Sequence, residues 1–334
     1  MKSVPPVISG DSDYAYATGV VRGKWARRLD KSALNRIIEA PKSGVSSALS
    51  ETGFSSSDLP AGEAIRLAWE ETVSLVESLS KNPEVTQLLR LSTDFTNAAA
   101  ALKAGLFDFE YEPLHLPGGL ASSEDLTAAA SGESPDSVPG PVLEGMRLAS
   151  ALYREHETGF IIDLALDSYF GAIFAERLLH SGRKFLGEYA RRWIDSANIS
   201  GFLRLRLAEM PPELFDRFFI EGGSISRKQF DEMRELEDDS IPGWLHNTAY
   251  GKVLSNAAGE LFREKSFAPL ERFIEELLED YLRQNVYVSF GLEVVLSYAL
   301  LKRREIRTVA AIVRLKGANI GADEIRERLS YGEI

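Results

Sequence analysis

The sequence predicts an all-α protein, on two observations. Four long stretches place apolar residues three or four positions apart over several turns, the spacing that gathers them on one face of a helix. Runs of strict apolar and polar alternation, which would indicate strands, are hard to find. The four helical stretches are AGEAIRLAWEETVSLVESLS (61–80), SGRKFLGEYARRWIDSANISGFLRLRL (181–207), PLERFIEELLEDYLRQNV (269–286) and FGLEVVLSYALLKRREIRTVAAIVRLKG (290–317).

Length and composition narrow the class of protein. The chain has 334 residues, enough for two or three domains or for one large core, and 44% of them are apolar, as in folded soluble proteins. With 50 acidic against 38 basic residues the net charge is −12, so the surface as a whole should repel nucleic acid and anionic lipid. Cysteine is absent, which excludes disulfides and thiolate chemistry and suits a reducing compartment.

Neither a cleavable leader nor a membrane span is predicted. The first residues, MKSVPPVISGDSD, carry prolines and acids where a leader would have an apolar core. The most apolar stretch is GFIIDLALDSYFGAIFA (159–175), but Asp163 and Asp167 interrupt it and it falls short of the roughly 20 residues that a bilayer needs. We therefore expect 159–175 to be a core helix, and any link to a membrane to come through a partner.

An acid followed three residues later by a small polar residue occurs in three segments, two of which lie within the helical stretches named above. Residues three apart lie on one face of a helix, so an acid and an amide there interrupt a face that should be buried. The most economical explanation is structural: in each segment the pair caps or bridges a neighbouring helix. The alternative is that the pairs line a shared central surface. The three segments are TDFTNAAAALKAGL (93–106) with Asp94 and Asn97, IDSANISGFLRLRL (194–207) with Asp195 and Asn198, and REIRTVAAIVRLKG (304–317) with Glu305 and Thr308.

A glycine turn follows each of these pairs along the chain. The turns are GGLASSEDL (118–126), GGSISRKQF (222–230) and GANIGADEI (317–325). Each has the pattern of a helix start, with an N-cap candidate at its fifth residue and a large apolar residue at its ninth. The N-cap candidates are Ser122, Ser226 and Gly321, with Asp125 and Glu324 as capping-box acids in the first and third turns.

The repetition predicts three copies of one helical unit of roughly 100 residues, the scale of a small domain. We place helical repeat 1 at residues 1–135, repeat 2 at 136–240 and repeat 3 at 241–334. Two stretches rich in Gly, Ser and Pro, 41–63 and 115–141, are expected to be loops of repeat 1, and IPGW (241–244) marks a third break.

Motifs that would carry catalysis or cofactor binding are not found. GVVRGKW around Lys24 lacks the spacing of a phosphate loop, and no dinucleotide fingerprint, HExxH pair or acyl-transfer triad exists. Asp238 and Asp239 in ELEDDSIPG do not complete an acidic magnesium motif, because Ile241 and Pro242 follow. We predict no catalytic residue, no metal ligand, no cofactor and no direct small-molecule substrate.

The C-terminal helical stretch is strongly basic in an otherwise acidic chain. LKRREIRTVAAIVRLKG (301–317) carries six Lys and Arg residues against one acid, and VVRGKWARRLDKSALNR (20–36) forms a similar basic stripe near the N-terminus. Two interpretations remain open: a solvated helix face, or a docking surface for an acidic partner, since opposite charge raises encounter rates.

Three stretches together carry a family resemblance. YAYATGVVRGKWARRL with LNRIIEA, FLGEYARRWIDSANISGFLRLRL with FFIEGGSISRKQF, and VVLSYALLKRREIRTVAAIVRLKGANIGADEIRERL resemble the C subunit of bacterial and archaeal V/A-type rotary ATPases, a relative of the d subunit of vacuolar ATPases. The likeness covers nearly the whole chain. It implies three similar helical bundles in a pseudo-threefold, funnel-shaped arrangement.

The resemblance also implies a function. Members of that family are non-catalytic rotor adaptors, which bind the D and F subunits of the central stalk and sit on the proteolipid ring of the membrane sector. They thereby transmit torque for ATP synthesis or ion transport, on the cytoplasmic side of the membrane as a peripheral part of the complex. The alternatives are a free-standing helical-repeat scaffold and a helical metal-dependent enzyme.

The partner interface is expected on the repeated polar residues and the C-terminal arginines. A socket that joins two rotor parts needs contacts spread around it. The candidates are Asp94, Asn97, Asp195, Asn198, Arg303, Arg304, Glu305, Arg307, Thr308 and Arg314.

Overall fold

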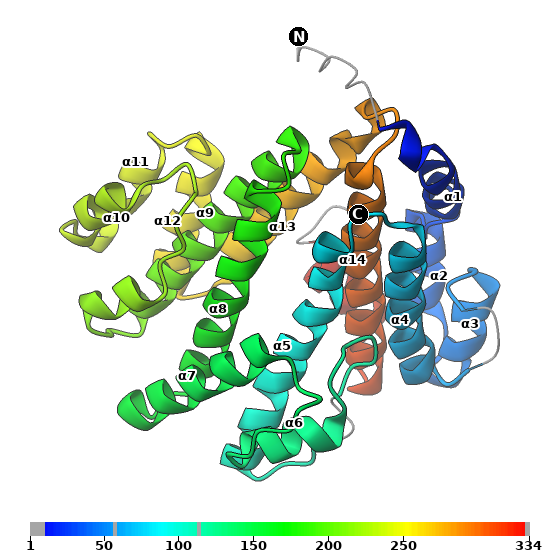
Figure 1. Cartoon of the computed structure of the whole chain (residues 1–334), viewed down its shortest axis with the longest axis horizontal. Helices are drawn as coiled ribbons and strands as arrows, with labels where there is room; N and C mark the ends of the chain where they lie inside the picture. Colours follow the sequence, from blue (N-terminus) through cyan, green and yellow to red (C-terminus); the bar gives the residue numbers. More distant parts are fainter. Residues whose placement is uncertain (1–10, 56–58, 112–114, 331–334) are drawn as a thin grey trace. The chain divides into compact units, whose positions relative to one another are not determined.

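The computed structural model describes residues 11–55, 59–111 and 115–330, which form helices and turns with no β-strand among them (Figure 1). The all-α prediction is therefore confirmed. The remaining residues lie outside the described ranges, among them 1–10, on which most of the prediction about a leader rests.

The chain divides into two compact units. Unit 1 comprises Met1–Thr86 and Glu279–Ile334, and unit 2 comprises Gln87–Leu278. Unit 1 thus contains both ends of the sequence. The predicted boundaries at 135 and 240 stay a prediction.

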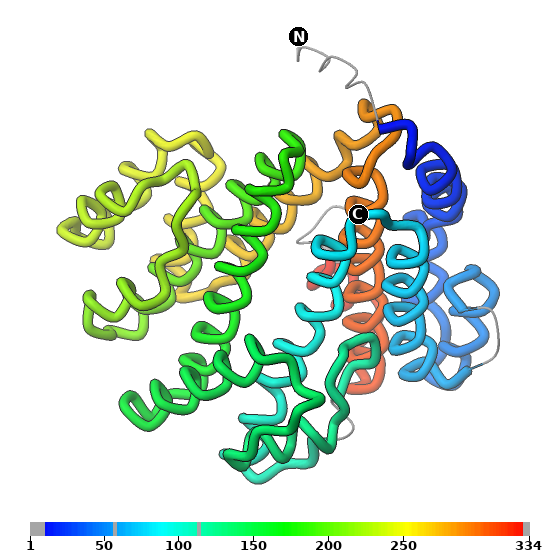
Figure 2. Tube along the Cα trace, in the orientation of Figure 1, coloured from blue at the N-terminus to red at the C-terminus, as the bar shows by residue number. Residues whose placement is uncertain are grey.

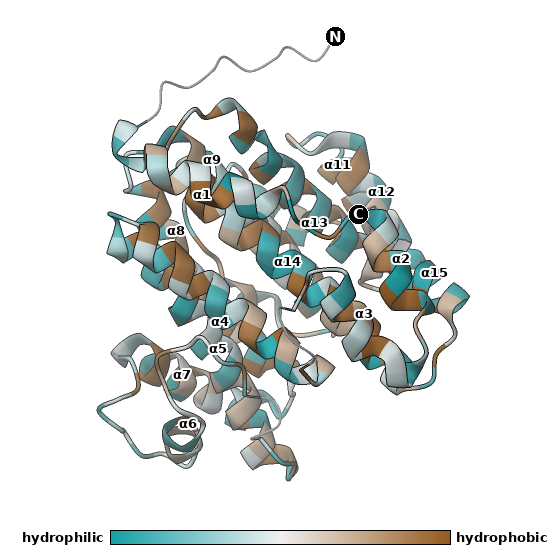
Figure 3. Cartoon of the chain, turned by 90° about the vertical axis from the view of Figure 1, so that its right-hand side faces the viewer, coloured by the Kyte–Doolittle hydropathy of each residue, from teal (hydrophilic) through white to brown (hydrophobic). Residues whose placement is uncertain are grey.

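Unit 1 is built around α14 (Leu292–Gly317), the C-terminal stretch predicted from its periodicity. Helix α14 packs against α1 (Ala15–Trp25), α2 (Lys31–Glu39) and α4 (Ala61–Leu79), so the blue start and the orange-to-red end of the chain run side by side (Figure 2). Both hydrophilic and hydrophobic residues occur along α14 and α2, as expected for helices with one face in a core (Figure 3). The unit also holds α3 (Val45–Glu51), the first residues of α5 (Pro83–Phe107), the end of α13 (Ala268–Arg283), α15 (Ala322–Ser330), and the 3₁₀ helices η1 (Ser12–Tyr14), η2 (Lys42–Gly44) and η6 (Gln284–Tyr287).

Hydrogen bonds tie the N-terminal segment to both ends of α14. Near its start, the guanidinium of Arg22 donates to the Val288 carbonyl at 2.7 Å. At its far end, the ammonium of Lys42 donates to the Gly317 carbonyl at 2.8 Å. The N-terminal segment as far as Lys42 therefore belongs to the same packed body as the C-terminal helix, at sequence separations of 266 and 275 positions.

Unit 2 consists of helical hairpins with one large core. Its longest helices are α5 and α9 (Lys184–Leu207), and α7 (Gly140–His156) packs along α8 (Phe160–Leu179), which packs along α9. Within that core the aromatic rings of four phenylalanines pack against one another: Phe202, Phe215, Phe219 and Phe230. The other elements are α6 (Ser123–Ala130), η4 (Pro212–Arg217), α10 (Arg227–Arg234), η5 (Asp238–Ser240), α11 (Ile241–Leu245), α12 (Gly251–Glu264) and the start of α13.

Two glycines allow helices of unit 2 to pack closely against aromatic side chains. A Cβ built on Gly145 of α7 would lie 2.8 Å from Phe95 Cε1, and one on Gly171 of α8 would lie 2.5 Å from Trp193 Cη2. Both distances are shorter than carbon atoms tolerate, so only glycine fits without a shift.

Two stretches that were expected to be loops contain helices. Helix α3 lies within 41–63 and buries Val45 and Leu49, and α6 lies within 115–141 and buries Leu126. Gly44 is the N-cap of α3 and Ser122 that of α6, whereas Ser46, Ser47 and Ser50 lie within α3 itself. The break expected at IPGW is also a helix, because Pro242 occupies the first turn of α11, where its missing N–H costs nothing.

The stretch 159–175 forms most of α8, as predicted for a core helix. Across the described ranges no helix combines the length and the apolar content that a membrane crossing requires.

Candidate functional site

Asp94 and Asn97 on α5 hold the turn that leads into α6. Both side chains are fully buried. The Asp94 carboxylate accepts hydrogen bonds from the backbone N–H groups of Leu120 and Ala121, at 2.8 and 3.0 Å. The Asn97 amide donates to the Leu116 carbonyl at 2.9 Å and accepts from the Leu116 N–H at 2.8 Å. The pair therefore satisfies backbone groups at both ends of one turn, as buried polar groups require.

Asp195 and Asn198 repeat this arrangement on α9. The Asp195 carboxylate accepts from the backbone N–H groups of Ser224 and Ile225, at 3.1 and 3.0 Å, and from the Ser224 hydroxyl. The Asn198 amide donates to the Ile220 carbonyl at 2.8 Å and accepts from the Ile220 N–H at 2.9 Å. The structural explanation of these two pairs is confirmed: an acid and an amide belong in a core helix here because they bind a neighbouring turn.

Each of these turns ends in the predicted N-cap. The Ser122 hydroxyl accepts from the Asp125 N–H at the start of α6. The Ser226 hydroxyl accepts from the Gln229 N–H at the start of α10, and the Gln229 side chain accepts from the Ser226 N–H, which completes a capping box. The first turn thus uses the predicted acid, Asp125, and the second uses an amide at the same place.

Glu305 on α14 binds a turn from the other end of the sequence. Its carboxylate accepts from the backbone N–H of Leu29 at 3.2 Å and pairs with the Lys302 ammonium. Leu29 stands directly before Asp30, whose carboxylate accepts from the Ala33 N–H and caps α2. Leu29 thus corresponds in position to the residues that precede Ser122 and Ser226.

Glu305 therefore does not bind the glycine turn 317–325, which follows it along the chain. From Glu305, α14 continues to Gly317, a rise of about 18 Å at about 1.5 Å per residue. The residues from there to Gly321 span about 14 Å at most, too little to return to Glu305. Helix α15 does begin after Gly321, at Ala322, but the turn that Glu305 binds comes from the N-terminal segment.

Burial changes the acidity of Asp94. Desolvation raises its pKa to about 6, while the N–H groups of Ala121 and Leu120 and the charge of Arg90 act in the opposite direction. In the second copy Asp195 also accepts a hydrogen bond from the Tyr250 hydroxyl at 2.5 Å. Burial, together with the neighbouring Asp195 charge, raises the pKa of Tyr250, so this hydroxyl remains a donor.

The predicted arginines of α14 fall into two groups. Arg303 is half-buried, with its guanidinium 5.3 Å from the centre of the Trp69 ring, and Arg304 pairs with Glu279 of α13. Arg307 and Arg314 are exposed. The first two therefore hold unit 1 together, and the last two face solvent.

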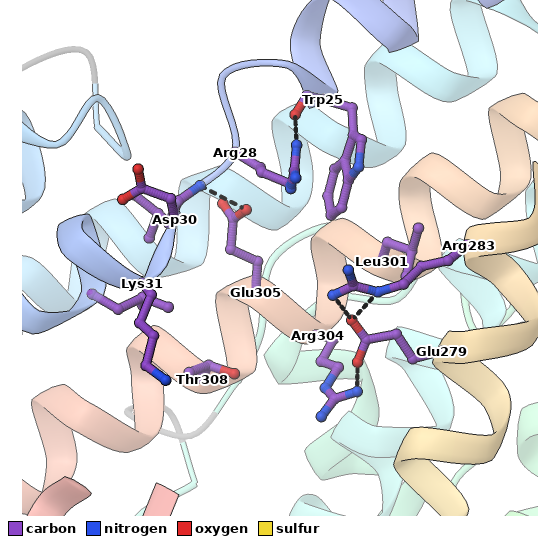
Figure 4. Close-up of a pocket in the computed structure, with 12 residues that line it drawn as sticks. Trp25, Arg28, Asp30, Lys31, Glu279, Arg283, Leu301, Arg304, Glu305 and Thr308 are labelled. Atoms are coloured by element: carbon purple, nitrogen blue, oxygen red, sulfur yellow. Dashed lines mark hydrogen bonds and ion pairs between the residues drawn. The ribbon is translucent and has the colours of Figure 1, made fainter. Parts of the chain in front are cut away.

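A pocket of about 190 Å³ in unit 1 adjoins Glu305 (Figure 4). Glu279 lies on one side of it and also accepts from Arg283 Nε at 2.9 Å. The sequence prediction missed this pocket, because its two walls are 276 positions apart at the Leu29–Glu305 contact and no local pattern joins them. Its lining residues are Trp25, Arg28, Leu29, Asp30, Lys31, Leu34, Glu279, Arg283, Leu301, Arg304, Glu305 and Thr308.

Comparison with known proteins decides the family. The family described as "ATP synthase (C/AC39) subunit" matches residues 17–328. The chain belongs to the C/AC39 family of ATP synthase subunits. The resemblance seen in the sequence is thereby confirmed.

The curated relatives are each named as the C subunit of an A-type ATP synthase. The protein from Methanocaldococcus jannaschii is 22% identical over 95% of this chain and 86% of its own length. The protein from Pyrococcus furiosus is 31% identical over 42% of this chain, and that from Haloferax volcanii is 28% identical over 58%. These two matches span 39% and 56% of the relatives' own lengths.

Among the described residues, no group of three or more His, Asp or Glu side chains is placed to hold a metal ion. The acidic residues discussed above accept hydrogen bonds from backbone N–H groups or pair with basic side chains.

Proposed function

We propose that this protein is the non-catalytic rotor adaptor of a V/A-type ATPase or ATP synthase. It would bind the D and F subunits of the central stalk on one side and the proteolipid ring on the other, at the cytoplasmic surface of the membrane. The observation that carries the proposal is the family match over residues 17–328. The name that the relatives share, the C subunit of an A-type ATP synthase, supports it.

The way in which polar residues are used supports a mechanical function. Asp94, Asn97, Asp195 and Asn198 are almost completely buried, and each binds backbone groups of a turn. A buried charge or amide that is fully hydrogen-bonded fixes one arrangement of its surroundings, because every alternative leaves it unsatisfied. Such a body is suited to transmitting torque without deforming.

We further propose the arrangement of three similar bundles, with one refinement of the third. Asp94 of α5, Asp195 of α9 and Glu305 of α14 each accept a hydrogen bond from the residue directly before an N-cap. The third bundle would then combine α14 with α1 and α2. It would thus be formed by segments from the N-terminal and C-terminal parts of the chain. Superposition of the three acids and their turns in an experimental structure tests this arrangement.

Binding to the stalk tests the function directly. The purified chain, mixed with the D and F pair at low salt, should elute with it as one complex on gel filtration. The chain alone, and the chain with an unrelated coiled coil, are the controls. Separate elution of the chain and the pair under all conditions would reject the adaptor function.

A further inference from the structure

We infer that the pocket between the α1–α2 junction and α14 receives a carboxylate side chain from an acidic protein segment. The inference rests on the proposed function, for which it names one contact surface and the chemistry of the partner. Its evidence is the distribution of charge between the units, the cations at the pocket, and the pocket's size and lining.

The net charge of the chain belongs entirely to unit 2. Residues 87–278 carry 19 basic and 31 acidic residues, whereas 1–86 and 279–334 together carry 19 of each. An acidic partner is therefore repelled by unit 2 as a whole and not by unit 1. Electrostatic complementarity selects unit 1 as the place where such a partner docks.

Each acidic side chain that lines the pocket already has a hydrogen-bond or ion-pair partner within this chain. Glu279 pairs with Arg283 and Arg304, and Glu305 accepts from the Leu29 N–H and pairs with Lys302. The remaining lining acid, Asp30, caps α2. These carboxylates therefore leave the two exposed cations of the α1–α2 junction without an ion-pair partner among the pocket's acids.

Arg28 and Lys31 are those two cations, and both are exposed. Arg28 donates to the Trp25 carbonyl at 3.4 Å, and its guanidinium lies 5.4 Å from the centre of the Trp25 ring, which positions it at the pocket. Within the described part of the chain, neither cation lies within 4.0 Å of a carboxylate oxygen. Arg27, which precedes Arg28 in the chain, and Arg307 of α14 are exposed as well. This surface therefore has positive charge that the chain itself does not neutralise.

The pocket has the size and lining for one acidic side chain. Its volume of about 190 Å³ admits a side chain and not a helix. Trp25, Leu34 and Leu301 offer apolar contact to a methylene stem, while Arg28 and Lys31 offer donors to its carboxylate (Figure 4). Exposed Arg27 and Arg307 lie next to lining residues in the sequence, Arg28 and Thr308, which favours an acidic protein segment over a small anion.

The test compares two charge-reversal variants of the full chain. The first, R28E/K31E, reverses both pocket cations. The second, R154E/K252E, reverses two exposed basic residues of unit 2, on α7 and α12. The first variant should remain folded, because Lys31 is the first residue of α2 and the helix dipole favours a negative charge there. Circular dichroism and urea unfolding verify this.

The measurement is the Kd for the purified D and F pair at low salt. We expect R28E/K31E to bind at least about tenfold more weakly than the wild type, and R154E/K252E to stay within about twofold of it. Equal affinity of R28E/K31E and the wild type would overturn the inference and leave the proposed function intact.

A second probe separates the two proposals if the wild type does not bind the pair. That result would reject the adaptor function, and a fluorescein-labelled poly-glutamate peptide then tests the surface alone. Salt-sensitive binding of the peptide that R28E/K31E loses and R154E/K252E keeps would support the inference. Absence of binding, or equal binding by both variants, would overturn it.

Discussion

The carboxylate of Glu305 accepts a hydrogen bond from the backbone N–H of Leu29, 3.2 Å away in space and 276 positions away in sequence. Asp94 and Asp195 do the same for residues 27 and 30 positions away, Ala121 and Ile225. One kind of contact therefore occurs on α5, α9 and α14, and in the last case it joins the two ends of the chain.

Replacing Glu305 should weaken this connection. Glu305→Ala leaves the partly buried Leu29 N–H without its acceptor, which should lower the free energy of unfolding by about 1–3 kcal/mol. Glu305→Gln keeps an acceptor oxygen but loses the pairing with Lys302, so a smaller loss is expected. Urea unfolding measures both. An alanine variant as stable as the wild type would mean that the contact contributes nothing.

Asn198 should be intolerant of change because it uses both ends of its amide. Asn198→Ala leaves the N–H and the carbonyl of Ile220 without their hydrogen-bond partner. Asn198→Asp places a carboxylate against that carbonyl. Each should lower the free energy of unfolding by about 2 kcal/mol or more at neutral pH. Asn256, exposed on α12, is the matched control, and Asn256→Ala should change stability by less than about 0.5 kcal/mol. Similar effects at both positions would contradict the account.

Asp94 should contribute less to the stability of the protein as the pH rises. Its pKa is raised to about 6 in the folded protein, above the value of about 3.9 in an unfolded chain. Between these values the folded state binds the proton more strongly, so the contribution of Asp94 to stability falls as pH rises from about 4 to 6.

The comparison with Asp94→Asn isolates this effect, since asparagine does not titrate. The stability of the wild type relative to the variant should decrease with rising pH across that window, by at most about 1.4 kcal/mol per pH unit. Chemical unfolding at several pH values between about 4.5 and about 7.5, which bracket the raised pKa, measures it. A difference that stays constant or grows with pH would show that burial does not raise this pKa.

At two positions that face a buried carboxylate, glycine should be the only residue that fits without strain. A Cβ on Gly119 would collide with the Asp94 carboxylate, and one on Gly223 with the Asp195 carboxylate. Gly223→Ala should therefore lower the melting temperature by several degrees, corresponding to about 1–3 kcal/mol. Gly187→Ala is the control, because nothing lies near that position of α9 and alanine favours a helix by about 1 kcal/mol. A neutral or stabilising effect of Gly223→Ala would contradict the prediction.

Periodicity was enough to predict four of the long helices, because each buries one face over many turns. The four predicted stretches correspond to α4, α9, α13 and α14. The short helices α3 and α6 were missed, since seven or eight residues give too few turns for a pattern, and the Gly, Ser and Pro residues at their ends are typical of loops as well.

The acid and amide pairs were found because they interrupt an apolar face, which is a local signal. The partner of Glu305 was not found, since Leu29 is an ordinary apolar residue and nothing near it marks a distant contact. The pocket beside Glu305 was also missed, because its lining residues come from two distant parts of the sequence and no local pattern joins them. The basic stripe at 20–36 was the one signal that could have directed attention to Arg28 and Lys31.

Ion pumping by the assembled complex tests the central claim most directly. Vesicles containing the membrane sector are combined with the ATP-hydrolysing head and its D and F stalk, with or without this chain, and ATP-driven ion uptake is measured beside ATP hydrolysis. The account predicts uptake only when the chain is present, with the chain itself hydrolysing no ATP. Equal uptake without the chain would contradict its function as the adaptor between stalk and ring.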